Sequence, residues 1–507
     1  MKIERQLPIL LIIQLHTVFI LLNSISIVFA YPPGWSDDIL INNDTLWHHD
    51  DPDITTDNDN NVWITWDDAT WTSGEIYFSK RDSLGNCLIP PTNLSNNTSV
   101  SKMSKIAVDR SNNIQFIWRD LSPSGYGVWH AKLASDGSVL VPSHLAVSGG
   151  GGFFSTLHPA MTINKYNEIY VIWDEINSLG NNQMCFSKLD SMGMPVVEKI
   201  PISPESLAAF WPGIGVDSFA NCHLGYRIDS IGGPYSDRLT YSKVDINGNI
   251  LISNKVFSYG SSPTMIADQQ QNIHVLYTNT NGSGTRIEHL KIDQQGNVLS
   301  GPDTIKPQTY AYYSNGHMAM DSLHYFHIVW TAAYVGAPGP GMYAKMDTMA
   351  NIIIPPTEII YPDYILRPDG LRIATDHRNR LHVTWLDQRR NPGYIGDIYY
   401  KRGENEQQIY EINHTFSPNT QSIIAAPNPF SHVLTIKLSN AGVKIKQDLE
   451  IFNAAGRKVY NTSFIPHNKC IYWDGRDNEG GILPAGVYFI NIENNMGGAK
   501  CMVIKLK

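Results

Sequence analysis

Carboxylates and arginines follow a large aromatic residue at several widely separated points of the chain. Asp68 follows Trp66 closely, and Arg119 and Asp120 come directly after Trp118. Such side chains suit a polar ligand such as a sugar, because arginine pairs with carboxylates through two parallel hydrogen bonds and aromatic faces pack on apolar patches. The candidate ligand-binding residues are Asp68, Trp71, Arg119, Asp120, Glu175, Arg227, Asp387 and Arg389.

Two different roles are open to the carboxylates in this set. Two carboxyl groups that face each other across a pocket can hydrolyse a glycosidic bond. A carboxylate that opens a loop can instead cap that loop, because its oxygens accept backbone N–H groups. Separation along the chain does not bring any two of them together, so the catalytic residues stay unassigned.

Neither a metal site nor a cofactor site is expected from the motifs. The stretch DNDNN at 57–61 resembles part of a calcium loop, but the six corresponding stretches lack its acids, and a turn is the better interpretation. Gly149 to Gly152 lacks the lysine of a phosphate loop. The five cysteines form no CxxC pair and no metal-ligand spacing.

The aromatic residues that precede the candidates recur at a fixed interval. Each stands nine residues after an Asp or Asn, and the steps from one Asp or Asn to the next are 52, 55, 53, 51, 53 and 55 residues. A constant period of this length marks a repeat architecture. The seven pairs are Asp57 and Trp66, Asp109 and Trp118, Asn164 and Trp173, Asp217 and Tyr226, Asp268 and Tyr277, Asp321 and Trp330, and Asp376 and Trp385.

Each repeat has the signals of four short β-strands. In the first repeat, strands are expected at 52–56, 62–66 and 76–80, and a fourth begins at 88. The second strand is apolar almost without alternation, so both of its faces should be buried. Four strands per unit of about fifty residues are typical of a propeller blade. The sequence therefore predicts an all-β fold, a seven-bladed β-propeller, with the loops after the second strands gathered on one face.

A propeller ring must close, because an open end would expose an edge strand. The segment Asp38–Ile41 resembles the fourth strands of other repeats, and we expect it to complete the last blade. The competing segment is Gln408–Ile412, which directly follows the last third strand.

The N-terminus and the charge indicate an exported protein. Residues 1–30 combine Lys2 and Arg5, an apolar stretch and small residues around Ala30, which predicts a signal peptide. An uncleaved membrane anchor is the alternative; after cleavage, no other segment is apolar enough to span a bilayer. The formal net charge of −9 argues against nucleic acid as a partner. We expect a secreted or cell-surface location.

The last part of the chain resembles a known module. PNPF at 427–430, Trp473-Asp474-Gly475 and PAGVY at 484–488 resemble the C-terminal sorting domains of type IX secretion substrates and the FlgD-type Ig-like domain. The resemblance implies a small Ig-like β-sandwich that engages the secretion machinery or attaches the protein to the cell surface. The expected segments are a signal peptide at 1–30, a propeller at 31–414, a linker at 415–422 and this module at 423–507.

The repeats resemble sialidase-like and other surface propellers, best seen in WLDQRRNPGYIGDIYYKR at 385–402. The Asp-box pattern of sialidases is absent from every corresponding turn, and no segment supplies their first catalytic arginine. The sequence favours a propeller that binds a glycan or a surface protein on its loop face. The alternatives are a sialidase-like glycoside hydrolase and a structural surface protein without a small ligand.

Overall fold

The computed structural model describes residues 34–404 and 423–506, with gaps. The signal-peptide, linker and 408–412 predictions lie outside the described residues. The gaps are 43–48, 70–73, 123–124, 150–157, 230–236, 280, 282–284, 306–311, 335–336, 362–367, 390–395, 427–429, 431–432, 439–446, 465–470 and 494–498.

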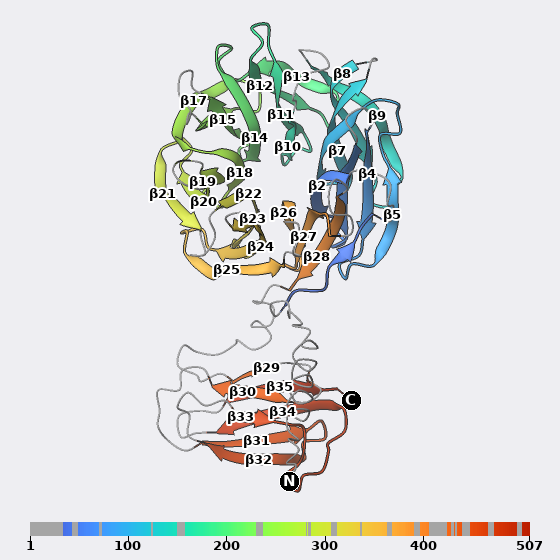
Figure 1. The fold of residues 1–507 in the computed structure, drawn as a ribbon, viewed down its shortest axis with the longest axis vertical. Coiled ribbons are helices and arrows are strands. Elements are labelled where there is room, and N and C mark those ends of the chain that lie inside the picture. Colours follow the sequence, from blue (N-terminus) through green and yellow to red (C-terminus); the bar gives the residue numbers. More distant parts are fainter. Residues whose placement is uncertain are drawn as a thin grey trace, which may run out of the picture. The chain divides into compact units, whose positions relative to one another are not determined.

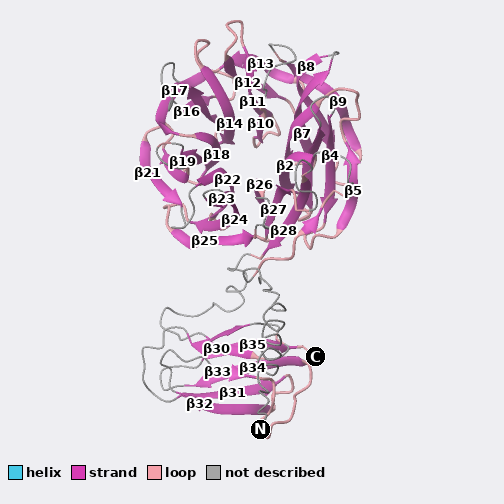
Figure 2. Ribbon diagram, viewed as in Figure 1, coloured by secondary structure: helices cyan, strands magenta, loops and turns pink. Residues whose placement is uncertain are grey.

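The chain forms two compact units, Met1–Asn405 and Glu406–Lys507. The described residues are strands, turns and loops throughout (Figure 2). In the described part of the first unit, seven four-stranded antiparallel sheets surround a central axis, which confirms the predicted seven-bladed β-propeller (Figure 1). The first strand of each blade lies nearest the axis and contacts the first strands of both neighbouring blades.

The blades follow one another along the chain, and each contains its strands in sequence order except the last. Blade 1 is β2 (His49–Thr56), β3 (Val62–Ala69), β4 (Gly74–Arg81) and β5 (Cys87–Asn93); blade 2 is β6 (Ser101–Val108), β7 (Ile114–Ser122), β8 (Gly125–Leu133) and β9 (Val139–Ser148); blade 3 is β10 (Ala160–Ile163), β11 (Ile169–Ile176), β12 (Asn182–Leu189) and β13 (Pro195–Pro201); blade 4 is β14 (Ala208–Val216), β15 (Cys222–Asp229), β16 (Asp237–Val244) and β17 (Ile250–Tyr259). Blade 5 is β18 (Ser261–Ala267), β19 (Ile273–Asn279), β20 (Arg286–Ile292) and β21 (Val298–Ile305); blade 6 is β22 (Tyr312–Met320), β23 (Phe326–Tyr334), β24 (Ala337–Met346) and β25 (Ile352–Ile360); blade 7 is β26 (Asp369–Thr375), β27 (Leu381–Asp387), β28 (Asp397–Gly403) and β1 (Ile39–Leu40).

The repeated aromatic residue is a core residue in every blade, as the period predicts. All seven lie on second strands and are fully buried or nearly so. Each indole or phenol must satisfy its polar atom when it is buried. The Trp173 Nε1–H donates to Glu175 at 2.9 Å, and the Trp385 Nε1–H donates to Asp387 at 3.2 Å. The carboxylate two residues after the tryptophan therefore serves the core in these blades.

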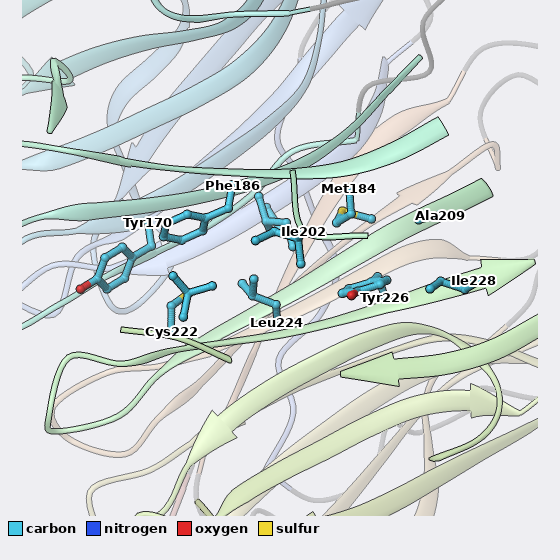
Figure 3. Close-up of a cluster of buried hydrophobic side chains, with 12 residues drawn as sticks. Tyr170, Met184, Phe186, Ile202, Ala209, Cys222, Leu224, Tyr226 and Ile228 are labelled. Carbon is cyan, nitrogen blue, oxygen red and sulfur yellow. The ribbon is translucent and has the colours of Figure 1, made fainter. Parts of the chain in front are cut away.

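Apolar side chains of adjacent blades pack against each other and hold the ring together. Between blades 3 and 4, Phe186 and Met184 of one sheet face Leu224 and Tyr226 of the next (Figure 3). Burial of a large apolar side chain contributes roughly 1.5–3 kcal/mol. Second strands buried on both faces follow from this sandwiching, which explains their continuous apolar sequence.

The acidic residue that starts each repeat period caps a turn. Asp57 accepts the backbone N–H groups of Asp59 at 3.0 Å and Asn61 at 2.8 Å, between the first and second strands. Asn60 has a left-handed φ of 64°, which asparagine tolerates better than most residues. The interpretation of 57–61 as a turn is confirmed.

The N-terminal segment closes the ring, as predicted for Asp38–Ile41. In β1, Ile39 pairs with Tyr400 and Leu40 pairs with Tyr399 of β28. Asp38 accepts a hydrogen bond from Arg389 at 2.7 Å and forms an ion pair with Lys401 at 2.8 Å. The outer strand of blade 7 is therefore drawn from the other end of the propeller sequence.

The second unit is a small β-sandwich. One sheet has the order β29, β30, β33 and the other has the order β32, β31, β34, β35. Trp473 of the first sheet packs edge-on against Tyr488 of the second, with ring centroids 5.4 Å apart. The strands are β29 (Ile423–Ala426), β30 (Leu434–Leu438), β31 (Gln447–Asn453), β32 (Lys458–Phe464), β33 (Ile471–Trp473), β34 (Gly486–Glu493) and β35 (Ala499–Lys505).

Candidate functional site

A cavity of about 850 Å³ lies on the propeller axis, walled by the first strands of all the blades. We call it the channel cavity. Its lining residues come mainly from the start of each first strand, which pairs with the end of the second strand, as Asp50 pairs with Asp67. The cavity therefore lies at the end of the ring where the loops after the second strands begin.

A β-bulge recurs near the start of the first strands. The register shifts between Asp50 and Asp53 in blade 1 and between Phe210 and Gly213 in blade 4, with similar shifts in blades 2, 5, 6 and 7. A bulge bends its strand and re-aims side chains, and bulges are common beside binding sites. The bulges include residues with left-handed φ, namely Asp51, Met103, Trp211, Ser262 and Gly370.

Trp211 is an exposed aromatic residue on the cavity wall. Its side chain is 39% exposed, and its φ of 51° costs about 1–2 kcal/mol for a residue other than glycine. The Arg227 guanidinium lies over the Trp211 ring, 4.3 Å from its centroid, and forms a 2.8 Å ion pair with Asp229. Trp211 and the Arg227 packed on its ring both line the cavity, and we call this pair the aromatic platform.

Carboxyl groups gather on the wall formed by blades 7 and 1. Burial, with contributions from the neighbouring Asp51 and Asp369, raises the pKa of Asp50 to about 6. Burial also raises the pKa of Asp67 well above its usual value, and Asp51 and Asp50 add to the effect. The Asp67 Oδ2 accepts the Met103 N–H at 2.9 Å. We call Asp50, Asp51, Asp67 and Asp369 the acid wall.

The structure brings one of the eight residues predicted from sequence, Arg227, to the channel cavity. Asp120 accepts hydrogen bonds from Ser101 at 2.7 Å and from Ser99, and Glu175 forms a 2.8 Å ion pair with Lys199. Asp120 and Glu175 therefore stabilise the segments around them through these contacts.

Four more predicted residues, all described by the structure, lie apart from the cavity lining. Asp387 and Arg389 pair with each other at the ring closure. Asp68 is paired in register with His49 and Glu75, and Arg119 is paired with Lys102. Trp71 lies outside the described residues.

Sequence reasoning missed Trp211 and most of the acid wall because it searched the loops after the second strands and not the start of the first strands. A signal was present in the sequence. Proline recurs five residues before the turn Asp or Asn in four repeats, as Pro52, Pro159, Pro212 and Pro263. Proline inside a strand is typical of bulges. The residue before it in blades 1 and 4 is Asp51 or Trp211.

Residues 425–505 match the family described as the secretion system C-terminal sorting domain. This confirms the resemblance seen in the tail. The protein is thus exported by type IX secretion, to the cell surface or beyond it. No helix in the described part of the chain has the length and apolar character to cross a membrane. No curated protein matches the chain.

Several solved structures are similar to the propeller. A protein of unknown function from Dyadobacter fermentans is 10% identical, with a TM-score of 0.45, over 73% of this chain and 99% of that one. An ulvan lyase is 9% identical, with a TM-score of 0.49, over 69% of this chain and 91% of that one. The NanB sialidase from Streptococcus pneumoniae is 11% identical, with a TM-score of 0.41, over 76% of this chain and 72% of that one.

Proposed function

We propose that the exported propeller binds a glycan in the channel cavity. The aromatic platform carries this proposal. A sugar ring has one apolar face and a rim of hydroxyl groups, so it suits an aromatic ring flanked by polar groups. In this cavity Arg227 and Asp237 supply polar groups beside Trp211, and the acid wall adds acceptors.

Backbone strain supports a role for Trp211 in binding. The equivalent position in blade 7 is Gly370, which adopts a left-handed φ of 59° without a side-chain penalty. Other blades hold Asp51, Met103 or Ser262 in the same conformation, so the bulge itself does not require a tryptophan, and Trp211 remains 39% exposed. Strained residues cluster at sites where the strain serves binding.

Trp211→Ala should therefore weaken glycan binding at least about tenfold, which corresponds to about 1.4 kcal/mol. A glycan array on the mature chain identifies the bound sugars, and calorimetry measures their affinity in parent and variant. Phe219→Ala is the matched control, because Phe219 is 67% exposed in the turn between β14 and β15, at the other end of these strands. An unchanged glycan affinity in Trp211→Ala would show that the aromatic platform does not bind the glycan.

Glycoside hydrolysis is the second candidate function, and Asp50 is the observation in its favour. Its carboxyl group reaches the cavity and has a pKa of about 6, so near neutral pH a sizeable fraction can donate a proton to a leaving group. Hydrolysis should then fall as pH rises above about 6, because Asp50 loses its proton. Asp50→Asn should reduce the rate by at least about a hundredfold.

The measurement is sugar release from the glycans that bind, between pH 5 and 8. The control is Asp245→Asn, because Asp245 lies in the exposed turn between β16 and β17. Bound glycans that stay intact throughout this range would leave binding as the function.

We further propose that residues 415–422 are a linker outside the propeller and that the tail acts as a separable export signal. A chain cut after Thr420 should keep the melting temperature of the propeller, because the core clusters of the described propeller contain no residue of the tail. The same cut should abolish surface labelling in the native host. Equal labelling of cut and full chains would show that the tail is dispensable for export.

A further inference from the structure

Three nitrogen-bearing side chains meet the channel cavity from equivalent positions of blades 2, 7 and 6, with Asp53 of blade 1 at the equivalent position between blades 2 and 7. Lys105, Arg372 and His317 line the cavity from β6, β26 and β22. Lys105 and Arg372 each come two residues after a left-handed residue, Met103 or Gly370, just beyond the bulge. We call these three side chains the cationic arc.

Neither charged member of the arc forms a direct ion pair with a described residue. The Lys105 Nζ donates to the Ser104 carbonyl at 3.2 Å, and an Arg372 Nη1–H donates to the Leu371 carbonyl at 3.0 Å. Within the described ranges, no carboxylate oxygen lies within 4.0 Å of either cation. Cations held in a protein wall without a counter-ion cost free energy, so an absent anion would stabilise them.

His317 adds a neutral donor to the arc. The Ile373 N–H donates to its Nδ1 at 3.3 Å, so the ring proton lies on Nε2. Burial lowers the pKa of His317, and Arg372 and Lys105 lower it further, which keeps the ring neutral. All three side chains therefore offer hydrogen-bond donors.

An acidic residue beside the arc, Asp53, already accepts a hydrogen bond from the backbone. Asp53 comes from the equivalent position of blade 1, and its Oδ2 accepts the Ile106 N–H at 3.2 Å. Burial lowers the pKa of Lys105, and Arg372 adds to this effect, whereas Asp53, Asp51 and Asp67 oppose it. Asp53 thus acts on the arc through space, while its Oδ2 is engaged by the backbone of blade 2.

We propose that the cationic arc binds one oxyanion of the glycan, a carboxylate or a sulfate group, while the sugar ring lies on Trp211. This inference rests on the proposed glycan binding and narrows the ligand to an acidic sugar. Arginine and lysine bind both groups through charge-assisted hydrogen bonds. The acid wall would repel a polymer charged at every sugar, so the cavity suits one isolated acidic group.

The test compares three small probes on the mature full chain by calorimetry at equal ionic strength: glucose, glucuronate and glucose 6-sulfate. Either acidic sugar, or both, should bind at least about tenfold more tightly than glucose. The acidic sugar that binds more tightly than glucose shows whether the cationic arc binds a carboxylate or a sulfate group. Lys105→Met and Arg372→Met should each remove most of this preference. Lys165→Met is the control, because Lys165 lies in the turn between β10 and β11 and packs on exposed Tyr166.

Thermal melting shows whether a variant has lost anion binding or has lost stability. Without any anion, both substitutions should leave the melting temperature unchanged or raise it, because each removes one of two charges that repel each other. A large fall in the melting temperature of both variants would mean that the cations stabilise the fold, and it would overturn the anion site.

The binding results also distinguish a failure of the cationic arc from a failure of glycan binding. Equal affinity for glucose and both acidic sugars overturns the cationic arc and leaves glycan binding intact. An acidic preference that survives in both variants also overturns the arc. Stabilisation by inorganic sulfate that depends on Lys105 and Arg372, without binding of any sugar, supports the anion site and rejects the glycan. Absence of binding by sulfate and by all three sugars overturns both.

Discussion

Trp118→Ala should lower the free energy of unfolding by about 3–5 kcal/mol. The Trp118 side chain is fully buried on β7, and its ring centroid lies 6.4 Å from that of Trp129. Its indole N–H donates to Asp120 at 3.4 Å, a long contact that adds little. The cost therefore comes from the cavity that alanine would leave between two blades.

Denaturant unfolding followed by circular dichroism measures this loss. Trp211→Ala is the matched control, because Trp211 is 39% exposed and its replacement removes little core packing. We expect that control to change stability by less than about 1 kcal/mol. A Trp118→Ala protein that unfolds at the parent's denaturant concentration would contradict the assignment of the repeated aromatic residue to the blade core.

Asp38→Ala should destabilise the ring closure by a similar amount, about 3–5 kcal/mol. The substitution leaves the fully buried Lys401 without its 2.8 Å partner and frees Arg389 from its 2.7 Å contact. A buried charge that loses its counter-ion costs more than the pair contributed. The adjoining strand β1 would then separate more easily from β28.

The pH dependence of stability distinguishes the loss of the Asp38–Lys401 ion pair from a general loss of packing. Burial lowers the pKa of Lys401 to about 8, and the loss of Asp38 would lower it further. Below about pH 8 the lysine is charged in the parent, and above its own lower pKa it is neutral in the variant. The stability gap to the parent should therefore narrow as the pH rises toward about 8 and stay constant above it. Asp37→Ala is the control, since Asp37 is exposed beside it. A constant gap, or an equal loss in the control, would contradict the role of the ion pair.

The repeats made the fold predictable because the same physical demand acts seven times. A second strand has a neighbouring blade on each side, so both of its faces must be apolar. Trp66 and Trp385 are the sequence signs of this burial. The closing strand was predictable for the same reason, since Ile39 and Leu40 match other outer strands. Each of these features depends on local pattern.

The candidate site was less predictable because the ring assembles it from distant segments. Trp211, Asp50 and Arg372 come from three blades and meet only when the ring closes. The bulge that re-aims them depends on backbone geometry, which no residue type dictates: its left-handed position holds Asp51, Met103 or Gly370 in different blades. Arg227 was found because it follows a repeated aromatic residue, Tyr226.

A crystal structure of the mature chain with a glycan chosen from the array would test the central claim most directly. We predict a sugar ring parallel to the Trp211 indole, inside the channel cavity, with its polar groups toward Arg227 and the acid wall. A glycan bound instead on the loops after the second strands, beside Asp68 or Arg119, or at the opposite end of the ring, would contradict the assignment of the channel cavity as the binding site.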